Sequence, residues 1–537
     1  MSSITATSYE ELPYDAYAFP VTHPDALAVA GALRGMVPAP VETCRILELG
    51  CANGGNLIPM AYGLPNSRCV GIDLSPRQIA DGQTVVDDLG LNNITLRAMS
   101  ILDVGPDFGE FDYIICHGVY SWVPRIVQDK ILEICRQNLA PNGIAYVSYN
   151  TYPGWHFRGM IREMMNFHVQ PFGTLQERVQ HSRAFLNLMA KIWDHQDPDS
   201  AIARCLKDEA EDLEKARDSY VFHEHLEDCN EPLYFQEFNS RAESHGLQYL
   251  WESKGSALAR SLPEEELRVL DSLSDDLIRR EQYFDFLRRR VFRRTLLCRQ
   301  EYPLTRVPNA QPVRGWQVTS HAKPVPDAPD FDSLSPVEFR TPDGVTLTTN
   351  RPLMKRLLGS LFDWFPQSIS VTDLWKAWQV DAERFASDGS AQEPIQTIED
   401  LTQELLILFL SDVVELHSQI PSFAAEVSER PVASALARHM ARRNVNVTNL
   451  RHFTMEMNNF ERLVLVRLDG TRTVNDVLQL LLADVAEGRM SLEAQGSNVT
   501  GAEAARELMS NALDSALSSL AARALLIGEL GGTPAHE

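Results

Sequence analysis

Two acidic residues, Glu48 and Asp73, lie where they could hold a ligand that contains a nucleoside. Glu48 belongs to the segment RILELGCANGGN, in which an apolar run leads into a cluster of glycines, and Asp73 ends a second apolar run, CVGID. Gly50, Ala52 and Gly55 fit the dinucleotide pattern G-x-A-x-x-G, with an acid about 20 residues further on for a ribose. A diphosphate would be repelled by Glu48, so we expect a ligand that is cationic at that end.

S-adenosylmethionine fits these residues better than a dinucleotide does, because it has an ammonium and a sulfonium but no phosphate. Glu48 can attract the ammonium, and Asp73 can accept hydrogen bonds from both ribose hydroxyls. Gly50 and Gly54 let the backbone approach the ligand. The N-terminus of a helix that starts near Asn56 can face the carboxylate of the ligand.

Short apolar runs alternate with helical patterns over the first 150 residues. The expected strands cover residues 45–50, 68–73, 94–99, 111–116 and 144–149. This alternation predicts a doubly wound, Rossmann-like parallel sheet in an α/β fold. Two later candidates, Leu247–Ser253 and Phe292–Arg299, would complete a seven-stranded sheet after a helical insert.

The remaining chain predicts several further parts. We expect a cofactor-binding core, a helical insert, the rest of the sheet with a regulatory region, a Pro-rich linker and a mainly α, winged-helix-like region. The boundaries are 1–154, 155–230, 231–302, 303–336 and 337–537, respectively. An Asp-Gly turn in VEFRTPDGVTLTTN predicts a hairpin at the start of the last part.

Composition narrows the class of protein. Of the 537 residues, 73 are acidic and 49 basic, and the net charge of −24 disfavours nucleic-acid binding. The eight cysteines form no C-x-x-C pair, which favours reduced thiols. The chain starts without a signal-peptide pattern and its apolar runs are too short to span a bilayer. We therefore expect a cytoplasmic protein that is not inserted in a membrane.

Four segments resemble successive motifs of class I S-adenosylmethionine-dependent methyltransferases: ELGCANGG, GIDLS, FDYIICHGVYSWV and LAPNGIAYVSYNTYPGWH. More narrowly, roughly the first 300 residues are similar to bacterial proteins with a methyltransferase regulatory domain. The rickettsial lysine methyltransferases that modify an outer-membrane protein belong to that group. A weaker likeness continues into NLRHFTMEMNNFERLVLVRLDGT. The resemblance implies S-adenosylmethionine as cofactor and a protein lysine side chain as acceptor.

The resemblance also implies a set of cofactor-binding residues. Class I enzymes often have an acid after the third strand, where this chain has Ser100 beside Ile101. The aromatic segment before the first strand would be a lid over the cofactor, or alternatively a strap on the surface. The expected set is Tyr14, Phe19, His23, Glu48, Gly50, Cys51, Gly54, Asn56, Asp73, Leu74, Ser100, Ile101, His117 and Gly118.

Candidate catalytic residues lie at or just after the ends of strands four and five, where the carboxyl ends of a doubly wound sheet hold ligands. His117 could act as a base or could only form hydrogen bonds that pack the loop. Tyr120 and Tyr149 would shape the acceptor channel rather than act as bases, since a phenol near pKa 10 starts protonated. We expect no metal site, because His223–His225 lacks further ligand spacing.

Two features leave alternatives open. Five of the arginines in DFLRRRVFRRTLLCR could be a solvated helix end paired with acids or a patch for an acidic substrate: Arg288, Arg289, Arg290, Arg293 and Arg294. The C-terminal region could dock a substrate protein, or could be structural or form a homo-oligomer. The rivals to a protein methyltransferase are a small-molecule N- or O-methyltransferase and a non-catalytic protein that senses the cofactor.

Overall fold

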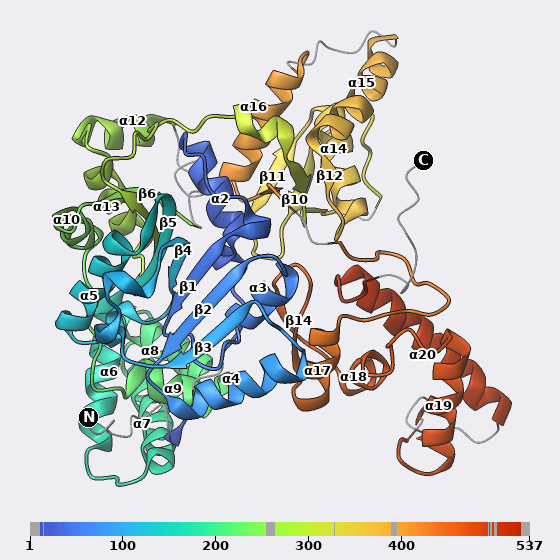
Figure 1. The fold of residues 1–537 in the computed structure, drawn as a ribbon, viewed down its shortest axis with the longest axis horizontal. Helices are drawn as coiled ribbons and strands as arrows, with labels where there is room; N and C mark the ends of the chain where they lie inside the picture. Colours follow the sequence, from blue (N-terminus) through green and yellow to red (C-terminus); the bar gives the residue numbers. More distant parts are fainter. Residues whose placement is uncertain are drawn as a thin grey trace.

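The computed structural model describes residues 11–13, 16–253, 264–326, 328–387, 395–419, 422–491, 493–494, 497–498 and 502–527. The centre of the molecule is one seven-stranded sheet with strand order β3-β2-β1-β4-β5-β7-β6 (Figure 1). Strands β1 to β5 are parallel, and β7 runs antiparallel to both of its neighbours. The strands are β1 (Arg45–Leu49), β2 (Arg68–Asp73), β3 (Ile94–Ala98), β4 (Phe111–Cys116), β5 (Leu139–Asn150), β6 (Leu247–Glu252) and β7 (Phe292–Arg299). The predicted seven-stranded, doubly wound sheet is confirmed.

Helices cover both faces of the sheet, as two apolar clusters show. On β5, Tyr146 belongs to one cluster, with residues of α2 and α3, whereas Val147 and Tyr149 belong to the other, with residues of α5 and α10. This division follows from the alternation of side chains along a strand. The helices are α2 (Pro24–Leu33), α3 (Leu57–Gly63), α4 (Pro76–Asp88), α5 (Arg125–Gln137), α10 (Phe235–Ser244), α12 (Glu264–Leu273) and α13 (Leu277–Arg288).

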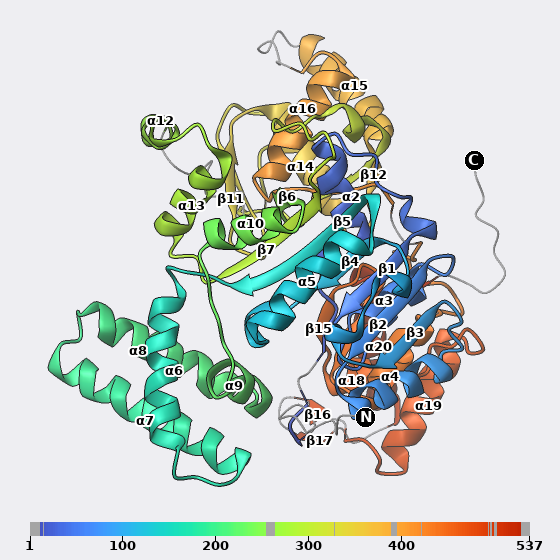
Figure 2. The same ribbon diagram turned by 60° about the vertical axis from the view of Figure 1, so that its left-hand side comes forward.

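A helical insert follows β5 and extends away from the sheet (Figure 2). It comprises α6 (Trp155–Val169), α7 (Leu175–Gln196), α8 (Ala201–Lys215) and α9 (Asp218–His225). A capping box of Thr174 and Glu177 starts α7. The insert has its own apolar core, which includes Val179, Leu206 and Phe222.

The segment that we expected to be a Pro-rich linker, 303–336, is part of a folded unit. Its strand β8 (Gln317–Thr319) pairs with β12 (Ile369–Ser370) and β13 (Glu415–His417). Its strand β9 (Lys323–Pro324) pairs with β10 (Val337–Arg340), which forms the predicted hairpin with β11 (Thr346–Thr349). Helices α14 (Pro352–Trp364), α15 (Val371–Ser387) and α16 (Ile398–Leu410) complete this unit. The prolines mark short strands and turns rather than a connector.

The last unit is mainly helical and lies beside α3 and α4 (Figure 1). It contains α17 (Ala435–Arg443), β14 (Asn446–Thr448), β15 (Thr454–Glu456), α18 (Asn459–Leu465), α19 (Val474–Ala486), β16 (Glu493–Ala494), β17 (Ser497–Asn498) and α20 (Ala502–Ala522). The Ala435 N–H donates to the Tyr62 hydroxyl of α3, and Arg443 pairs with Asp88 of α4. Within the described ranges, no helix is both long and apolar enough to cross a bilayer.

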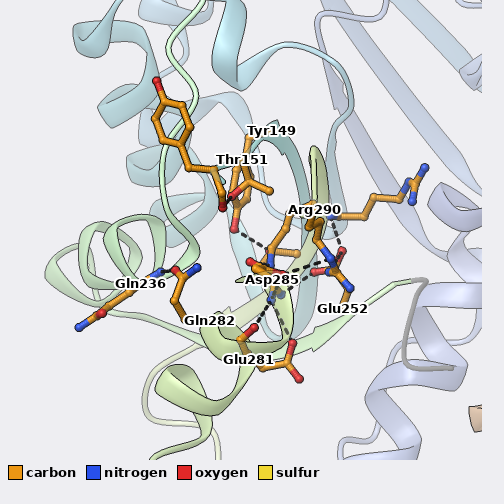
Figure 3. Close-up of polar contacts among 12 residues, drawn as sticks. Tyr149, Thr151, Gln236, Glu252, Glu281, Gln282, Asp285 and Arg290 are labelled. Carbon is orange, nitrogen blue, oxygen red and sulfur yellow. Dashed lines mark hydrogen bonds and ion pairs between the residues drawn. The ribbon is translucent and has the colours of Figure 1, made fainter. Parts of the chain in front are cut away.

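Arg293 of β7 is buried and connects β7 to β6 and α13 through ion pairs. Its side chain is fully buried and pairs with Asp285 at 2.8 Å and with Glu252 at 3.0 Å. The guanidinium also lies 3.8 Å from the ring centroid of Phe235. Glu252, Glu281 and Asp285 gather here with Arg290 (Figure 3). At Arg293 and Arg290, the arginine cluster is therefore a buried ionic network rather than a solvated helix end.

Replacing Arg293 with Met would leave buried carboxylates without their cation. We expect the free energy of unfolding to fall by about 3–5 kcal/mol, as when one partner of a buried pair is removed. Urea unfolding measures this change. Arg314→Met is the matched control, because Arg314 and its partner Glu399 are both largely exposed and such a pair contributes at most about 1 kcal/mol. Equal unfolding midpoints for the two variants would contradict the assignment.

Candidate active site

The loop after β1 turns back onto the end of β2. The N–H groups of Gly50 and Cys51 donate to the Ile72 carbonyl at 2.9 and 3.0 Å. Gly50, Ala52 and Gly54 all have positive φ angles, of 74°, 51° and 78°. At Gly50 a Cβ atom would lie 2.4 Å from the Val119 side chain, so this position needs glycine for space as well as for conformation.

Asp73 fixes this loop from the end of β2. One carboxylate oxygen accepts from the Ala52 N–H at 2.8 Å, and the other accepts from the Ser75 N–H at 2.9 Å. A carboxylate oxygen can accept more than one hydrogen bond. Asp73 can therefore hold the loop and still accept from hydroxyl groups, such as those of a ribose.

Glu48 is buried rather than open to solvent at the mouth of the loop. Its Oε1 accepts from the Asn56 side-chain amide at 2.7 Å, whereas its Oε2 has no hydrogen-bond partner among the described residues. Burial, with a contribution from the charge of Asp73, raises the pKa of Glu48 to about 8. The carboxyl is thus mostly protonated at neutral pH without a ligand. A buried carboxyl with an unused oxygen fits the ammonium of S-adenosylmethionine, whose charge would favour ionisation.

A strap of residues 16–22 crosses the loop. The Phe19 N–H donates to Asn56 Oδ1 at 2.9 Å, and the Phe19 ring lies 3.9 Å from the His117 ring, centroid to centroid. Gly55 is so close to the strap that a Cβ would lie 2.4 Å from the Ala16 carbonyl oxygen. The strap therefore lies against the predicted cofactor loop; Tyr14 falls outside the described residues.

His23 follows the strap and starts α2. Its Nδ1 accepts from the Asp25 N–H at 3.2 Å, and burial lowers the pKa of His23 to about 4. It remains a predicted cofactor contact, but its observed role is that of a helix cap.

His117 follows β4 and is enclosed by aromatic side chains. Its Nδ1 lies 2.9 Å from the Tyr146 hydroxyl, and the Gly118 N–H donates to Ser148 at 2.8 Å. Burial and the charge of Arg294 lower the pKa of His117 to about 3. The ring is therefore neutral and weakly basic. Of the two roles that the sequence left open, the geometry favours hydrogen bonding and packing over general-base catalysis.

Tyr120 and Tyr149 do not lie among the side chains that surround His117. Both are fully buried in the cluster on the α5 and α10 face, where each ring packs on Phe238. The Tyr149 hydroxyl lies 3.0 Å from that of Thr295. Since side chains on β5 alternate, Tyr146 and Ser148 face His117 and Tyr149 faces away. The predicted channel role of these two tyrosines is not supported by their positions.

The remaining residues of the predicted cofactor-binding set follow β1, β2 and β3, at the C-terminal ends of these strands. Ser100 and Ile101 follow β3, and Ser100 Oγ already accepts from the Leu102 N–H at 3.2 Å. Leu74, which follows β2, is 44% exposed, whereas Cys51 is buried. Their contacts with a cofactor stay a prediction.

A cavity of ≈ 590 Å³ is lined by Pro20 and Val21 of the strap, by residues of α2 and by residues of the later units. Its walls include His23, His417, Arg451 and His452. Within the described residues, its lining does not include Glu48, Gly50 or Asp73. Of the residues predicted to bind the cofactor, His23 lines this interdomain cavity but the residues of the loop do not, so the cavity lies next to the loop rather than at it.

Glu48 predicts a pH dependence of stability in the ligand-free protein. Its pKa is about 8 in the folded protein against 4.5 as the ordinary value. The folded state thus binds the proton more tightly, so the stability contributed by Glu48 is complete below about pH 4.5 and is lost as the pH rises towards 8. We expect Glu48→Gln to remove this decline, which amounts to a few kcal/mol at most.

Urea unfolding between pH 5 and 8.5 measures the slope. Asp81→Asn, which changes an exposed acid on α4, is the control and should keep the slope of the unmodified protein. A Glu48→Gln variant with that same slope would show that the carboxyl ionises normally when the protein is folded.

Three families match successive parts of the chain. Residues 40–217 match a family described as a methyltransferase domain, and residues 217–299 match a predicted methyltransferase regulatory domain. Residues 429–525 match the PKMT C-terminal winged helix domain. The second match includes β6 and β7, so the regulatory domain supplies the last two strands of the sheet.

Individual proteins match over longer stretches. The uncharacterized protein RP789 of Rickettsia prowazekii is 33% identical over 528 residues, which cover 97% of this chain and 93% of that protein. RP028 of the same organism is 42% identical over 243 residues, which cover 45% of this chain and 96% of RP028. The solved structure of PKMT2 from Rickettsia typhi in complex with AdoHcy is 30% identical, with a TM-score of 0.83, and the match covers 96% of this chain and 100% of PKMT2.

These matches extend over nearly the whole chain and agree with the sheet order and the loop geometry. S-adenosylmethionine is therefore the methyl donor. The chain belongs to the family of class I S-adenosylmethionine-dependent methyltransferases that combine a regulatory domain with a PKMT C-terminal winged helix domain.

Proposed function

We propose that the methyl acceptor is a lysine side chain of a protein. The observation that carries this proposal is the likeness to PKMT2 of Rickettsia typhi, which covers 96% of the chain and so includes the units beyond the methyltransferase domain. The PKMT winged helix domain at residues 429–525 supports the same acceptor. A methyltransferase domain alone would not distinguish among acceptors.

The proposed cofactor contacts follow from the residues around the loop. Glu48 would pair with the ammonium through its unused oxygen, and Asp73 would accept from the ribose hydroxyls. Ser100 and Ile101 would contact the adenine. The bound cofactor supplies an electrophilic methyl group; the protein orients the acceptor and excludes water around it.

A lysine must lose its proton before it can accept a methyl group, and its ordinary pKa is about 10.4. With its pKa near 3, His117 is too weak a base for this task. The surroundings of His117 favour a different route, because Phe19 and Phe292 pack around its ring and the charge of Arg294 acts on it. Burial among such groups disfavours an ammonium, so we infer that desolvation would lower the pKa of the acceptor lysine.

Labelled S-adenosylmethionine and a bacterial lysate test the acceptor. We expect label in protein bands, with mass spectrometry placing the added methyl groups on lysines. Asp73→Ala should lose this activity at limiting cofactor, because losing charged hydrogen bonds weakens cofactor binding about ten- to a hundredfold. Asp81→Ala is the matched control, since Asp81 is an exposed acid on the next helix.

Two outcomes would contradict the proposal. Label confined to the small-molecule fraction would identify a small-molecule methyltransferase instead. Tight cofactor binding without turnover on any fraction would indicate a protein that senses the cofactor.

A further inference from the structure

The side chain of Asn56 lies where three parts of the protein meet. It is 4% exposed and lies between Glu48 of β1, the strap and the C-terminal unit. Its amide contacts the Phe19 N–H, Thr22, Glu48 and, at 2.9 Å, Nε2 of His452. Asn56 and His452 are 396 residues apart in the sequence.

The donors around Asn56 determine its orientation. The Phe19 N–H can only donate, so the atom that it contacts is the carbonyl oxygen Oδ1. The Asn56 NH₂ group therefore donates to Glu48 at 2.7 Å and to Thr22 at 3.1 Å. His452 Nε2 meets the same carbonyl oxygen, so it must carry a proton and donate to Asn56.

His452 belongs to the turn between β14 and β15, within the winged helix match. Its φ is 62°, in the left-handed region that residues other than glycine adopt uncommonly. The Asn449 side chain accepts from the Arg451 and Phe453 N–H groups and so braces the turn. The His452 side chain is buried, and this burial keeps its pKa well below the usual value, so the ring is neutral.

The same turn is anchored on both sides. Arg451 donates to the Pro366 carbonyl at 2.6 Å and pairs with Glu415 of β13. Thr454, at the start of β15, accepts from the Ala18 N–H of the strap at 3.1 Å. The turn thus contacts the unit that contains β8, β12 and β13, the strap and Asn56.

We propose that His452 is a positioning residue of the cofactor site: it holds the Asn56 amide, which in turn holds the Glu48 carboxyl against the ammonium of S-adenosylmethionine. The C-terminal winged helix domain thereby completes the cofactor site, whatever role it has towards the acceptor. This role does not depend on which acceptor the enzyme methylates.

His452→Phe tests the role, because it keeps a ring of similar size and removes the donor. We expect the dissociation constant for AdoHcy, measured by calorimetry, to rise about five- to tenfold, as for the loss of one buried hydrogen bond. At saturating labelled S-adenosylmethionine, the rate of label transfer to proteins of a bacterial lysate should stay within about twofold of that of the unmodified protein. His452→Gln, whose amide nitrogen can take the place of Nε2, should restore affinity to within about twofold of the unmodified protein.

Two controls separate positioning from packing. His439→Phe changes another buried histidine of the C-terminal unit, one that lies 3.7 Å from Asp88 of α4 but does not contact Asn56, and it should leave the dissociation constant unchanged. In a Glu48→Gln background, His452→Phe should change the dissociation constant by less than about twofold, since its effect passes through the carboxyl. Thermal melting confirms that each variant is folded.

The proposal is overturned if His452→Phe binds AdoHcy as tightly as the unmodified protein does. It is also overturned if the Gln variant loses as much affinity as the Phe variant, or if the loss is the same in the Glu48→Gln background.

Discussion

The cofactor site depends on the burial of one carboxyl group. Glu48 is buried near the C-terminal end of the central strand β1. One of its carboxyl oxygens is hydrogen-bonded to Asn56, and the other has no partner among the described residues. Burial without a compensating cation is unfavourable for a carboxylate. A cationic ligand supplies the positive charge that stabilises the ionised Glu48 carboxylate, which the protein alone does not provide. The burial that disfavours the negative charge of Glu48 therefore also selects a cationic ligand over a diphosphate.

The elements that position the Glu48 carboxyl come from different parts of the chain. The positive-φ loop after β1 brings Asn56 next to Glu48, and Asp73 on β2 fixes the loop by its backbone. The strap adds Phe19 above the loop, and the C-terminal turn adds His452. Contacts from several units thus meet at the Asn56 side-chain amide. Through this amide, the C-terminal unit can affect cofactor binding although it is distant in the sequence.

Much of the fold follows from local patterns. Alternating apolar runs and helices predicted the seven strands, and the Asp-Gly turn predicted the hairpin of β10 and β11. Glu48 and Asp73 could be selected because each lies near the C-terminal end of a strand and close to glycines: Glu48 is one residue before the end of β1, and Asp73 ends β2. The prolines of 303–336 were misleading, because the strands there are short and pair with segments far along the chain. Strand periodicity places Tyr149 on the face opposite to Tyr146 and Ser148, but only the tertiary structure shows that His117 meets the face of Tyr146. No local pattern points from His452 to Asn56, because only tertiary packing brings them together.

Proton release on cofactor binding tests the central claim most directly. Calorimetry at pH 7 in buffers of different ionisation enthalpy measures the number of protons that leave when S-adenosylmethionine binds. If the buried Glu48 carboxyl ionises to pair with the ammonium, the unmodified protein should release about one proton more than Glu48→Gln does. Equal proton release from the two proteins would contradict the account.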